Sequence, residues 1–299
     1  MNETFEAYRQ LLNVYLSAAI PVGAEIPAPG GIPKCLAEGM NYSLLAGGKR
    51  LRGVLLLAAY AEGGDAPGDA LPFAAALEMI HAYSLIHDDL PAMDDDDLRR
   101  GKPTNHKVFG EGMAVLNGDG LLNFAYETAL EAALQWPRPQ QALKAVAALA
   151  RRAGVRGMVA GQCLDVSKEG SRPTRDLVGY IHAHKTADLF IAPLEAGMML
   201  WGAGEELVQA GRDYGYHLGM AFQMIDDCLD LQGDEALLGK RTGMDEARGK
   251  LTWPALAGLE ATRRQAGFHM EQALAAAGKF KRMENFLKAL AQTMLVRVQ

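Results

Sequence analysis

Apolar side chains recur at three- and four-residue spacings along most of the chain, while alternating β-branched runs are scarce. This is the pattern of helices that bury one face. It predicts helices over 5–19, 72–90, 113–134, 140–164, 174–200, 205–231 and 253–276, with breaker clusters at 21–33, 62–69, 136–139 and 167–173. Since the connections are mostly short, we expect an all-α protein, a large bundle of long helices around a central cavity, with 1–299 as a single domain.

One connection, 232–252, is long and rich in glycine and charge. A long loop in a compact domain is often functional, so this segment is the candidate for a lid over the cavity.

Composition narrows the class of protein. The 299 residues are 49% hydrophobic and carry a net charge of -6, which does not suit a general nucleic-acid binder. The first residues lack the basic and apolar regions of a signal peptide. The longest apolar runs, such as 54–61, are too short to cross a bilayer. We therefore expect a soluble cytoplasmic protein with neither nucleic acid nor membrane as a partner.

The most informative stretch is the first acidic cluster, HDDLPAMDDDDLRRG, over 87–101. Asp88 and Asp89 end an apolar helix, where the helix dipole disfavours carboxylates and a bound cation would offset the cost. Asp88 and Asp94 would not share a face of a continuous helix, but Pro91 ends or bends it and lets them converge. For residues 95–97 alone, a solvated acidic turn is the simpler interpretation.

A second acidic cluster, QMIDDCLD, covers 223–230. Gln223, Asp226 and Asp230 fall on about one face of a helix whose other residues are mostly apolar. One such helix could carry a solvated polar stripe, but two acidic clusters on apolar helices make that explanation poor. Hard oxygen ligands without a histidine–cysteine set indicate magnesium, which usually takes one or two carboxylates and binds substrate phosphates through its remaining positions.

Basic residues stand where they could complete a diphosphate site. Each alone would be an ordinary surface cation, but together with the acidic residues they suggest two anion sites. One would bind its anion through metal ions, and the other through basic side chains alone. They are Lys49 and Arg52 after two glycines, Arg99 and Arg100 after the first acidic cluster, Lys185 before Thr186, and Lys240 and Lys250 in the long loop.

At this point the chain resembles the trans-polyprenyl diphosphate synthases, and among them the bacterial farnesyl diphosphate synthases. The resemblance covers nearly the whole chain and rests on GGKRLR, DDLPAMDDDDLRRG, GQCLDV, HKTADLF, FQMIDDCLD and GKRTGMD. It implies the isoprenoid synthase fold, usually as a homodimer, and condensation of isopentenyl diphosphate with dimethylallyl or geranyl diphosphate to farnesyl diphosphate. Gly53 departs from the family's usual proline, which could loosen the helix start after Arg52.

The resemblance also implies roles for individual residues. Asp88, Asp94 and Asp226 would bind magnesium, three ions in all, with support from Asp89 and Asp230. Arg99, Lys185, Gln223 and Lys240 would hold the allylic diphosphate, and Lys49, Arg52, His81 and Arg100 the isopentenyl diphosphate. Lys185 would help to neutralise the departing diphosphate, and carbonyl oxygens near Lys185, with Thr186 and Gln223, would stabilise the carbocation. Gln162 and Asp165 belong to a motif that faces the allylic cavity.

Product length is expected to depend on Tyr83, about 7.5 Å before Asp88 along the helix, with the small Ser84 beside it. An aromatic residue at this place marks farnesyl makers in the family, although Tyr83 in isolation could equally be ordinary core. The alternatives are a geranylgeranyl or geranyl diphosphate synthase and, from a different class, a non-catalytic partner subunit of a synthase.

Overall fold

The computed structural model describes residues 3–232 and 248–295, and nearly all of its elements are helices. Within these ranges the strands are β1 (Leu98–Arg99) and β2 (Lys102–Pro103), an antiparallel pair with Leu98 opposite Pro103. The all-α expectation is confirmed. In chain order the helices are α1 (Glu3–Ala19), α2 (Lys34–Leu44), α3 (Leu51–Ala61), η1 (Pro67–Ala70), α4 (Leu71–Asp88), α5 (Asn105–Phe109), α6 (Glu111–Leu134), α7 (Pro139–Ala153), α8 (Met158–Ser167), α9 (Arg175–Ile181), the π-helical turn η2 (His182–Ala187), α10 (Asp188–Trp201), α11 (Glu205–Gln232), α14 (Trp253–Ala257), α15 (Leu259–Ala277) and α16 (Glu284–Leu295).

The predicted helical segments are helical, but two of them are not continuous. The segment 140–164 breaks between α7 and α8, where Gly157 packs so closely on the carbonyl of Arg152 that a side chain would not fit. The segment 253–276 breaks at Gly258, whose φ of 78° is in the left-handed region that favours glycine. Both breaks occur at a glycine, and a prediction from the spacing of apolar residues does not take glycine into account.

Helices α2, α3, α5 and α16, and the short helix η1, were not predicted. Helix α3 is buried from Gly53 to Tyr60, so it lacks the polar face that makes a helix visible as a periodic pattern. Gly53 does not loosen its start: α3 begins at Leu51, and the N–H of Gly53 donates to Oε1 of Glu78 on α4 at 2.9 Å.

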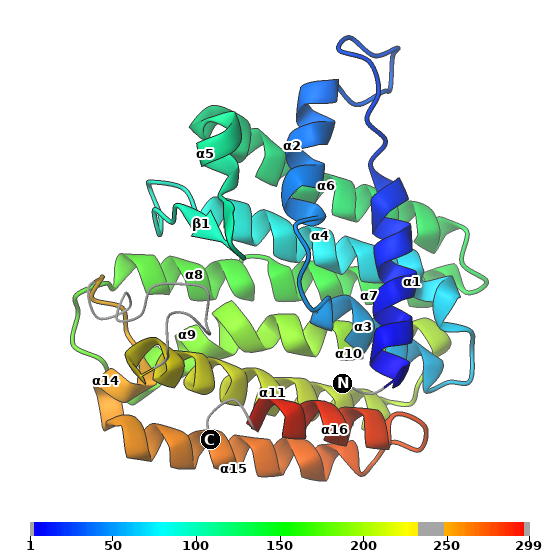
Figure 1. Ribbon diagram of the computed structural model, residues 1–299. Helices are drawn as coiled ribbons and strands as arrows, with labels where there is room; N and C mark the ends of the chain where they lie inside the picture. The colour runs from blue at the N-terminus through cyan, green and yellow to red at the C-terminus, as the bar shows by residue number, and fades with distance from the viewer. Residues whose placement is uncertain (1–2, 233–247, 296–299) are drawn as a thin grey trace.

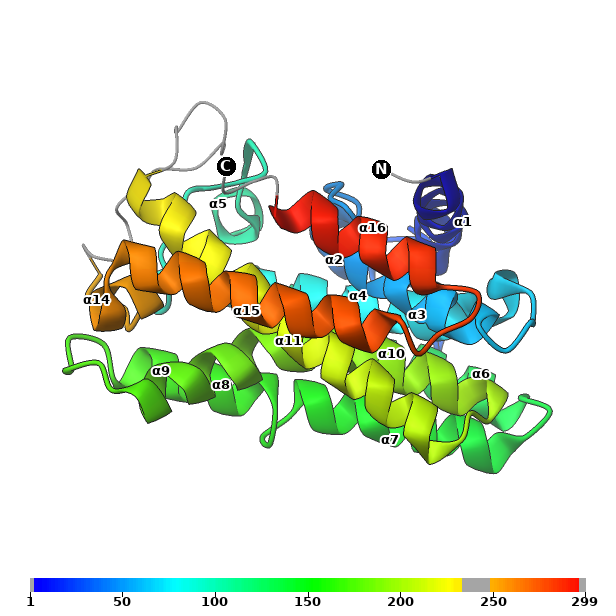
Figure 2. The ribbon, with the colours of Figure 1, turned by 90° about the horizontal axis from the view of Figure 1, so that it is seen from below.

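The long helices lie side by side in a stack, with α6 and α4 at one side and α11 and α15 at the other, while α1 and α2 cross them (Figure 1). Helix α10 is at the centre, where it packs against α3, α7 and α11. Figure 2 shows the same stack from below, with α15 and α16 covering one face. Every residue of α10 from Asp188 to Met198 is buried, as expected for a central helix.

The buried apolar side chains form two clusters. Helices α3 and α10 contribute to both, because their opposite faces pack on different neighbours. None of the helices in the described ranges combines the length and apolarity needed to cross a bilayer.

Candidate active site

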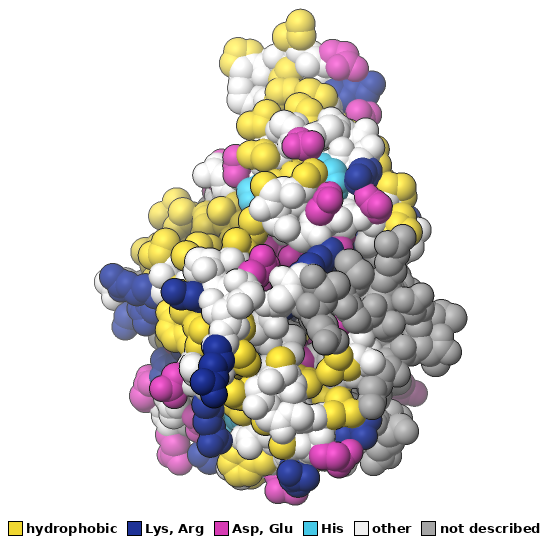
Figure 3. Space-filling model, turned by 90° about the vertical axis from the view of Figure 1, so that its left-hand side faces the viewer, with side chains coloured by type: hydrophobic (Ala, Val, Ile, Leu, Met, Phe, Trp, Pro, Cys, Tyr) yellow, Lys and Arg dark blue, Asp and Glu magenta, His cyan; other side chains and the backbone are white. Residues whose placement is uncertain are grey.

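Both acidic clusters line one cavity of about 610 Å³ at the end of the stack that carries β1, α8 and α9. This volume is in the usual range for a site that encloses a small ligand. Figure 3 faces this end and shows acidic and basic side chains next to one another near its centre. The predicted residues that line the cavity are Asp88, Asp94, Arg99, Arg100, Asp165, Lys185, Thr186, Gln223, Asp226, Asp230 and Lys250.

The first acidic cluster turns at the end of α4, as Pro91 predicted. The N–H of Asp94 donates to the carbonyl of Asp88 at 2.8 Å, which brings the two carboxylates to the same cavity. Nε2 of Gln162 donates to Oδ1 of Asp88 at 2.8 Å. Burial raises the pKa of Asp88, against the opposing charge of Lys185. Burial also favours protonation of Asp94, but the charge and hydrogen bond of Lys250, 2.7 Å away, outweigh it and lower the pKa of Asp94.

The second acidic cluster lies on α11, with Gln223, Asp226 and Asp230 facing the cavity from one side of the helix. Gln223 also contacts η2, where Oγ1 of Thr186 donates to its Oε1 at 2.7 Å. These three side chains point to the same side of the helix, as their spacing in the sequence predicted.

The π-helical turn η2 presents Lys185 and Thr186 to the cavity. Nζ of Lys185 donates to Oδ2 of Asp165 on α8 at 2.5 Å. Burial opposes the charge on Lys185, but Asp165 and Asp88 outweigh it and raise the lysine pKa. The turn lies directly against Gly161 of α8 and Gly219 of α11, where added side chains would strike its backbone. π-Helical turns are often found at functional sites, and this one is held by close backbone packing.

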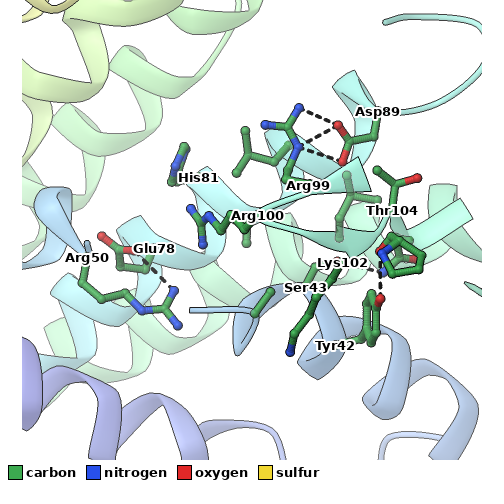
Figure 4. A pocket seen from close by; sticks show the side chains of 16 residues that line it. Tyr42, Ser43, Arg50, Glu78, His81, Asp89, Arg99, Arg100, Lys102 and Thr104 are labelled. Atoms are coloured by element: carbon green, nitrogen blue, oxygen red, sulfur yellow. Dashed lines mark hydrogen bonds and ion pairs between the residues drawn. The ribbon is translucent and has the colours of Figure 1, made fainter. Parts of the chain in front are cut away.

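A smaller pocket of about 40 Å³ adjoins the cavity and shares Arg99 and Arg100 with it. Figure 4 shows His81 beside Arg100, and Arg99 paired with Asp89. Nη1 of Arg52 lies 3.2 Å from Nε2 of His81. Burial, and after it the charges of Arg52 and Arg100, hold the pKa of His81 well below its ordinary value, so the imidazole is neutral. The result is an arginine-rich recess next to the acidic cavity, in which Glu78 and Asp89 are paired with Arg50 and Arg99.

Not every predicted residue lies in the cavity. Asp89 lines the smaller pocket, where both of its oxygens accept from Nε of Arg99, at 2.7 and 2.9 Å. Burial raises the pKa of Asp89 to about 6, against the lowering effect of Arg99. In the structure Asp89 contacts the guanidinium group of Arg99, and its role in metal binding stays a prediction. Lys49 is exposed, and Lys240 lies outside the described residues together with most of the predicted lid.

Tyr83 is buried between α4 and its neighbours, with its ring edge-on to His87 at 5.7 Å. Burial, followed by the charges of Tyr126 and Asp88, raises its pKa to about 12. Oγ of the adjacent Ser84 donates to the carbonyl of His81 at 2.9 Å. Neither residue is among those that line the two cavities in the described part of the chain, so a role in product length stays a prediction.

Three further charged residues belong to the site or its surroundings and were not predicted from the sequence. Arg248, 2.7 Å from Asp96, gave no signal, because its partner is far away in the chain. Arg50 is buried and anchors the GGKRLR segment, with Nη2 donating to the carbonyl of Leu44 at 2.7 Å. Asp227, between two expected ligands, was visible only as part of the second cluster. It lines the cavity but contacts protein donors.

The side-chain atoms in the cavity that could coordinate a metal ion suit magnesium. They are carboxylate oxygens, and neutralising lysines already lie among them. Within residues 3–232 and 248–295, no three His, Cys, Asp or Glu side chains converge closely enough to hold an ion by themselves. Magnesium seldom needs such a set, because waters and substrate phosphates complete its coordination. The arrangement therefore suits ions that arrive together with a diphosphate.

Comparison with known proteins agrees with this geometry. Residues 33–292 match the polyprenyl synthetase family. The chain is 47% identical over 241 residues to a farnesyl diphosphate synthase of Geobacillus stearothermophilus, covering 81% of each chain. It is 44% identical over 258 residues to the large subunit 1 of a heterodimeric geranylgeranyl pyrophosphate synthase of Arabidopsis thaliana, covering 85% of this chain and 67% of the relative. A crystal structure of an FPP/GFPP synthase from Zymomonas mobilis superposes with a TM-score of 0.83 at 35% identity, covering 97% of both chains. The chain therefore belongs to the polyprenyl synthetase family.

Proposed function

We propose that this protein is a short-chain prenyltransferase that condenses isopentenyl diphosphate with dimethylallyl or geranyl diphosphate to form farnesyl diphosphate. The observation that carries the proposal is the cavity itself, in which both acidic clusters and several cations meet. A recess rich in arginine adjoins it, and its two carboxylates, Glu78 and Asp89, are each paired with an arginine. A reaction between two diphosphates needs two anion sites side by side, and this pair of pockets supports such an arrangement.

The acidic cavity would hold the allylic diphosphate. Asp88, Asp94 and Asp226 would bind magnesium ions, with Asp89 and Asp230 in support, and Arg99, Lys185, Gln223 and Lys240 would contact the phosphates. The recess with Arg52, His81 and Arg100 would hold isopentenyl diphosphate, together with Lys49. Its guanidinium groups are donors, which suits a phosphate. Its carboxylates already have arginine partners, Glu78 with Arg50 and Asp89 with Arg99.

The reaction follows from this placement. The allylic C–O bond breaks, its electron pair leaves with the diphosphate, and the double bond of isopentenyl diphosphate attacks the allylic C1. A proton then leaves the new cation, with the departed diphosphate as acceptor. Bound magnesium would neutralise the charge that develops on the leaving group. Lys185 contributes a fixed positive charge beside it, and Thr186 and Gln223 place oxygen atoms near the electron-poor carbon.

Two alternative functions are a synthase with a different product length and a non-catalytic partner subunit. Geranylgeranyl diphosphate as the product is favoured by the plant relative at 44% identity, and farnesyl diphosphate by the bacterial relative at 47% and by the aromatic Tyr83. A non-catalytic partner subunit would be expected to lose one acidic cluster, whereas here both clusters line the same cavity.

We also propose a homodimer, with residues 1–299 of each chain as one domain. Exposed apolar side chains on α6 support it, since Leu116 and Leu134 are 54% and 70% exposed and Leu130 lies one turn before Leu134. Light scattering after gel filtration would test the dimer, and a monomer at micromolar concentration would contradict it.

The central test is product analysis. The protein, incubated with isopentenyl and dimethylallyl diphosphates and magnesium, should yield a fifteen-carbon diphosphate on chromatography, and chelation should abolish the product. Asp226→Ala should lower turnover by at least about 100-fold with the fold intact. Full turnover in chelator, or in this variant, would contradict the proposed metal sites. The absence of any prenyl product from the wild type would contradict the function.

A further inference from the structure

Asp227 follows the expected metal ligand Asp226, but protein donors surround its side chain. Oδ1 accepts from Nε2 of Gln223 at 2.9 Å. Oδ2 accepts from the backbone N–H of Trp253 at 3.0 Å, and Nε2 of His182 lies 3.2 Å from it. The residue is only 3% exposed. Both carboxylate oxygens therefore face the protein, which is an arrangement for orienting neighbours.

The contacts of Asp227 determine which way the Gln223 amide faces. A carboxylate can only accept hydrogen bonds, so Gln223 must present its NH₂ group to Asp227. The amide carbonyl then faces the other way, toward Oγ1 of Thr186 at 2.7 Å. A carbonyl oxygen also only accepts, so the hydroxyl of Thr186 must donate its proton to Gln223.

Thr186 lines the cavity, so the direction of its proton determines which charge it presents there. We propose that Asp227 is a positioning residue that, through Gln223, keeps the Thr186 hydroxyl proton away from the cavity and its oxygen lone pairs toward the reacting allylic carbon. The inference rests on the proposed function, in which that carbon becomes positively charged. A pre-oriented oxygen stabilises the charge without reorganisation at the moment of reaction, whereas a hydroxyl proton would oppose it.

An asparagine at position 227 would remove this control while keeping the size of the side chain. Its amide can accept or donate, so Gln223 could turn over and donate to Thr186. The threonine proton would then be free to point into the cavity. Asp227→Asn should therefore slow the chemical step without disturbing the metal ions.

The test is steady-state kinetics across a magnesium titration. Asp227→Asn should lower kcat at least about tenfold, by analogy with the loss of one oriented group in an active site. Its magnesium activation midpoint should equal that of the wild type, whereas the midpoint for Asp226→Asn should shift. Glu62→Gln is the matched control, because Glu62 is also a buried carboxylate that accepts backbone N–H groups, those of residues 281–283. It lies at the end of α3 that is opposite Arg52. The control variant should keep the wild-type kcat.

A double-mutant cycle separates this role from a merely structural one. Thr186→Val removes the hydroxyl, so adding Asp227→Asn to it should change kcat by less than about twofold. If the two losses multiply, or if Asp227→Asn shifts the magnesium midpoint, the positioning role is overturned. Should Asp227→Asn not fold, Gln223→Met takes its place in the cycle, and a wild-type kcat in that variant overturns the role as well. An inactive wild type overturns the proposed function, and this inference with it. An active wild type with multiplying losses overturns the inference alone.

Discussion

The π-helical turn η2 rests so closely on α8 that one added methyl group at Gly161 should displace Lys185 and Thr186. A Cβ at Gly161 would lie nearest to the backbone N of Lys185, and it would also come within 2.7 Å of Cα of Lys185 and 2.8 Å of the carbonyl carbon of His184. These are backbone atoms, so no change of rotamer can relieve the contact. To bring Cα of Lys185 to an ordinary separation of 3.4 Å, η2 and α8 must move apart by about 0.7 Å, and the nearer backbone N requires a larger movement.

A shift of this size should affect turnover more than folding. A misplacement of about 1 Å can lower the rate about 100-fold, because the reacting groups lose their alignment. Overpacking should lower the free energy of unfolding by about 1–3 kcal/mol, partly offset by a gain of up to about 1 kcal/mol from replacing a helical glycine. We therefore expect Gly161→Ala to lower kcat by between about 10- and 100-fold while remaining folded.

The assay is pyrophosphate release at saturating substrates, with urea unfolding measured in parallel. Gly179→Ala is the matched control, since Gly179 lies in the adjoining helix α9 and a Cβ there would meet no atom within 4 Å. It should keep the wild-type kcat and be as stable as the wild type or more so. A wild-type kcat for Gly161→Ala would refute the idea that this contact positions Lys185 and Thr186.

Three further predictions follow. Arg99→Lys should raise KM for the allylic diphosphate and Arg100→Lys that for isopentenyl diphosphate, each about tenfold, because lysine loses the bidentate fork; identical substrate profiles would argue against separate sites. Tyr83→Ala should yield products longer than fifteen carbons on chromatography and lower the free energy of unfolding by about 3 kcal/mol, and an unchanged product would place the floor of the cavity elsewhere. Burial and the neighbouring His217 lower the pKa of His269 to about 4 from its ordinary 6.5. The unfolded chain then binds the proton more readily, so the free energy of unfolding should fall as the pH drops from 6.5 toward 4. Urea titrations should show a weaker pH dependence in His269→Gln, and an equal dependence would contradict this.

Local patterns in the sequence were enough to predict most of the helices and the way the acidic clusters face. Asp226 and Asp230 are one helical turn apart, and that spacing alone places them on one side of α11. Pro91 predicted that the chain turns after Asp88, and Asp94 does come back to bond with it. The apolar pattern failed for α3, because a helix buried on all sides has no polar face to produce a period.

Other features depend on residues that are far apart in the chain. Asp89 faces Arg99 because the β1–β2 pair brings the arginine back to α4. The orientation of Asp227 requires the N–H of Trp253, 26 residues further along. The sequence by itself determined most of the helices and the two acidic clusters, because helix periodicity and turn chemistry act over a few residues. The tertiary structure decided which carboxylates face the cavity and which face protein donors, because a buried polar group takes the partner that the packing of distant helices brings to it.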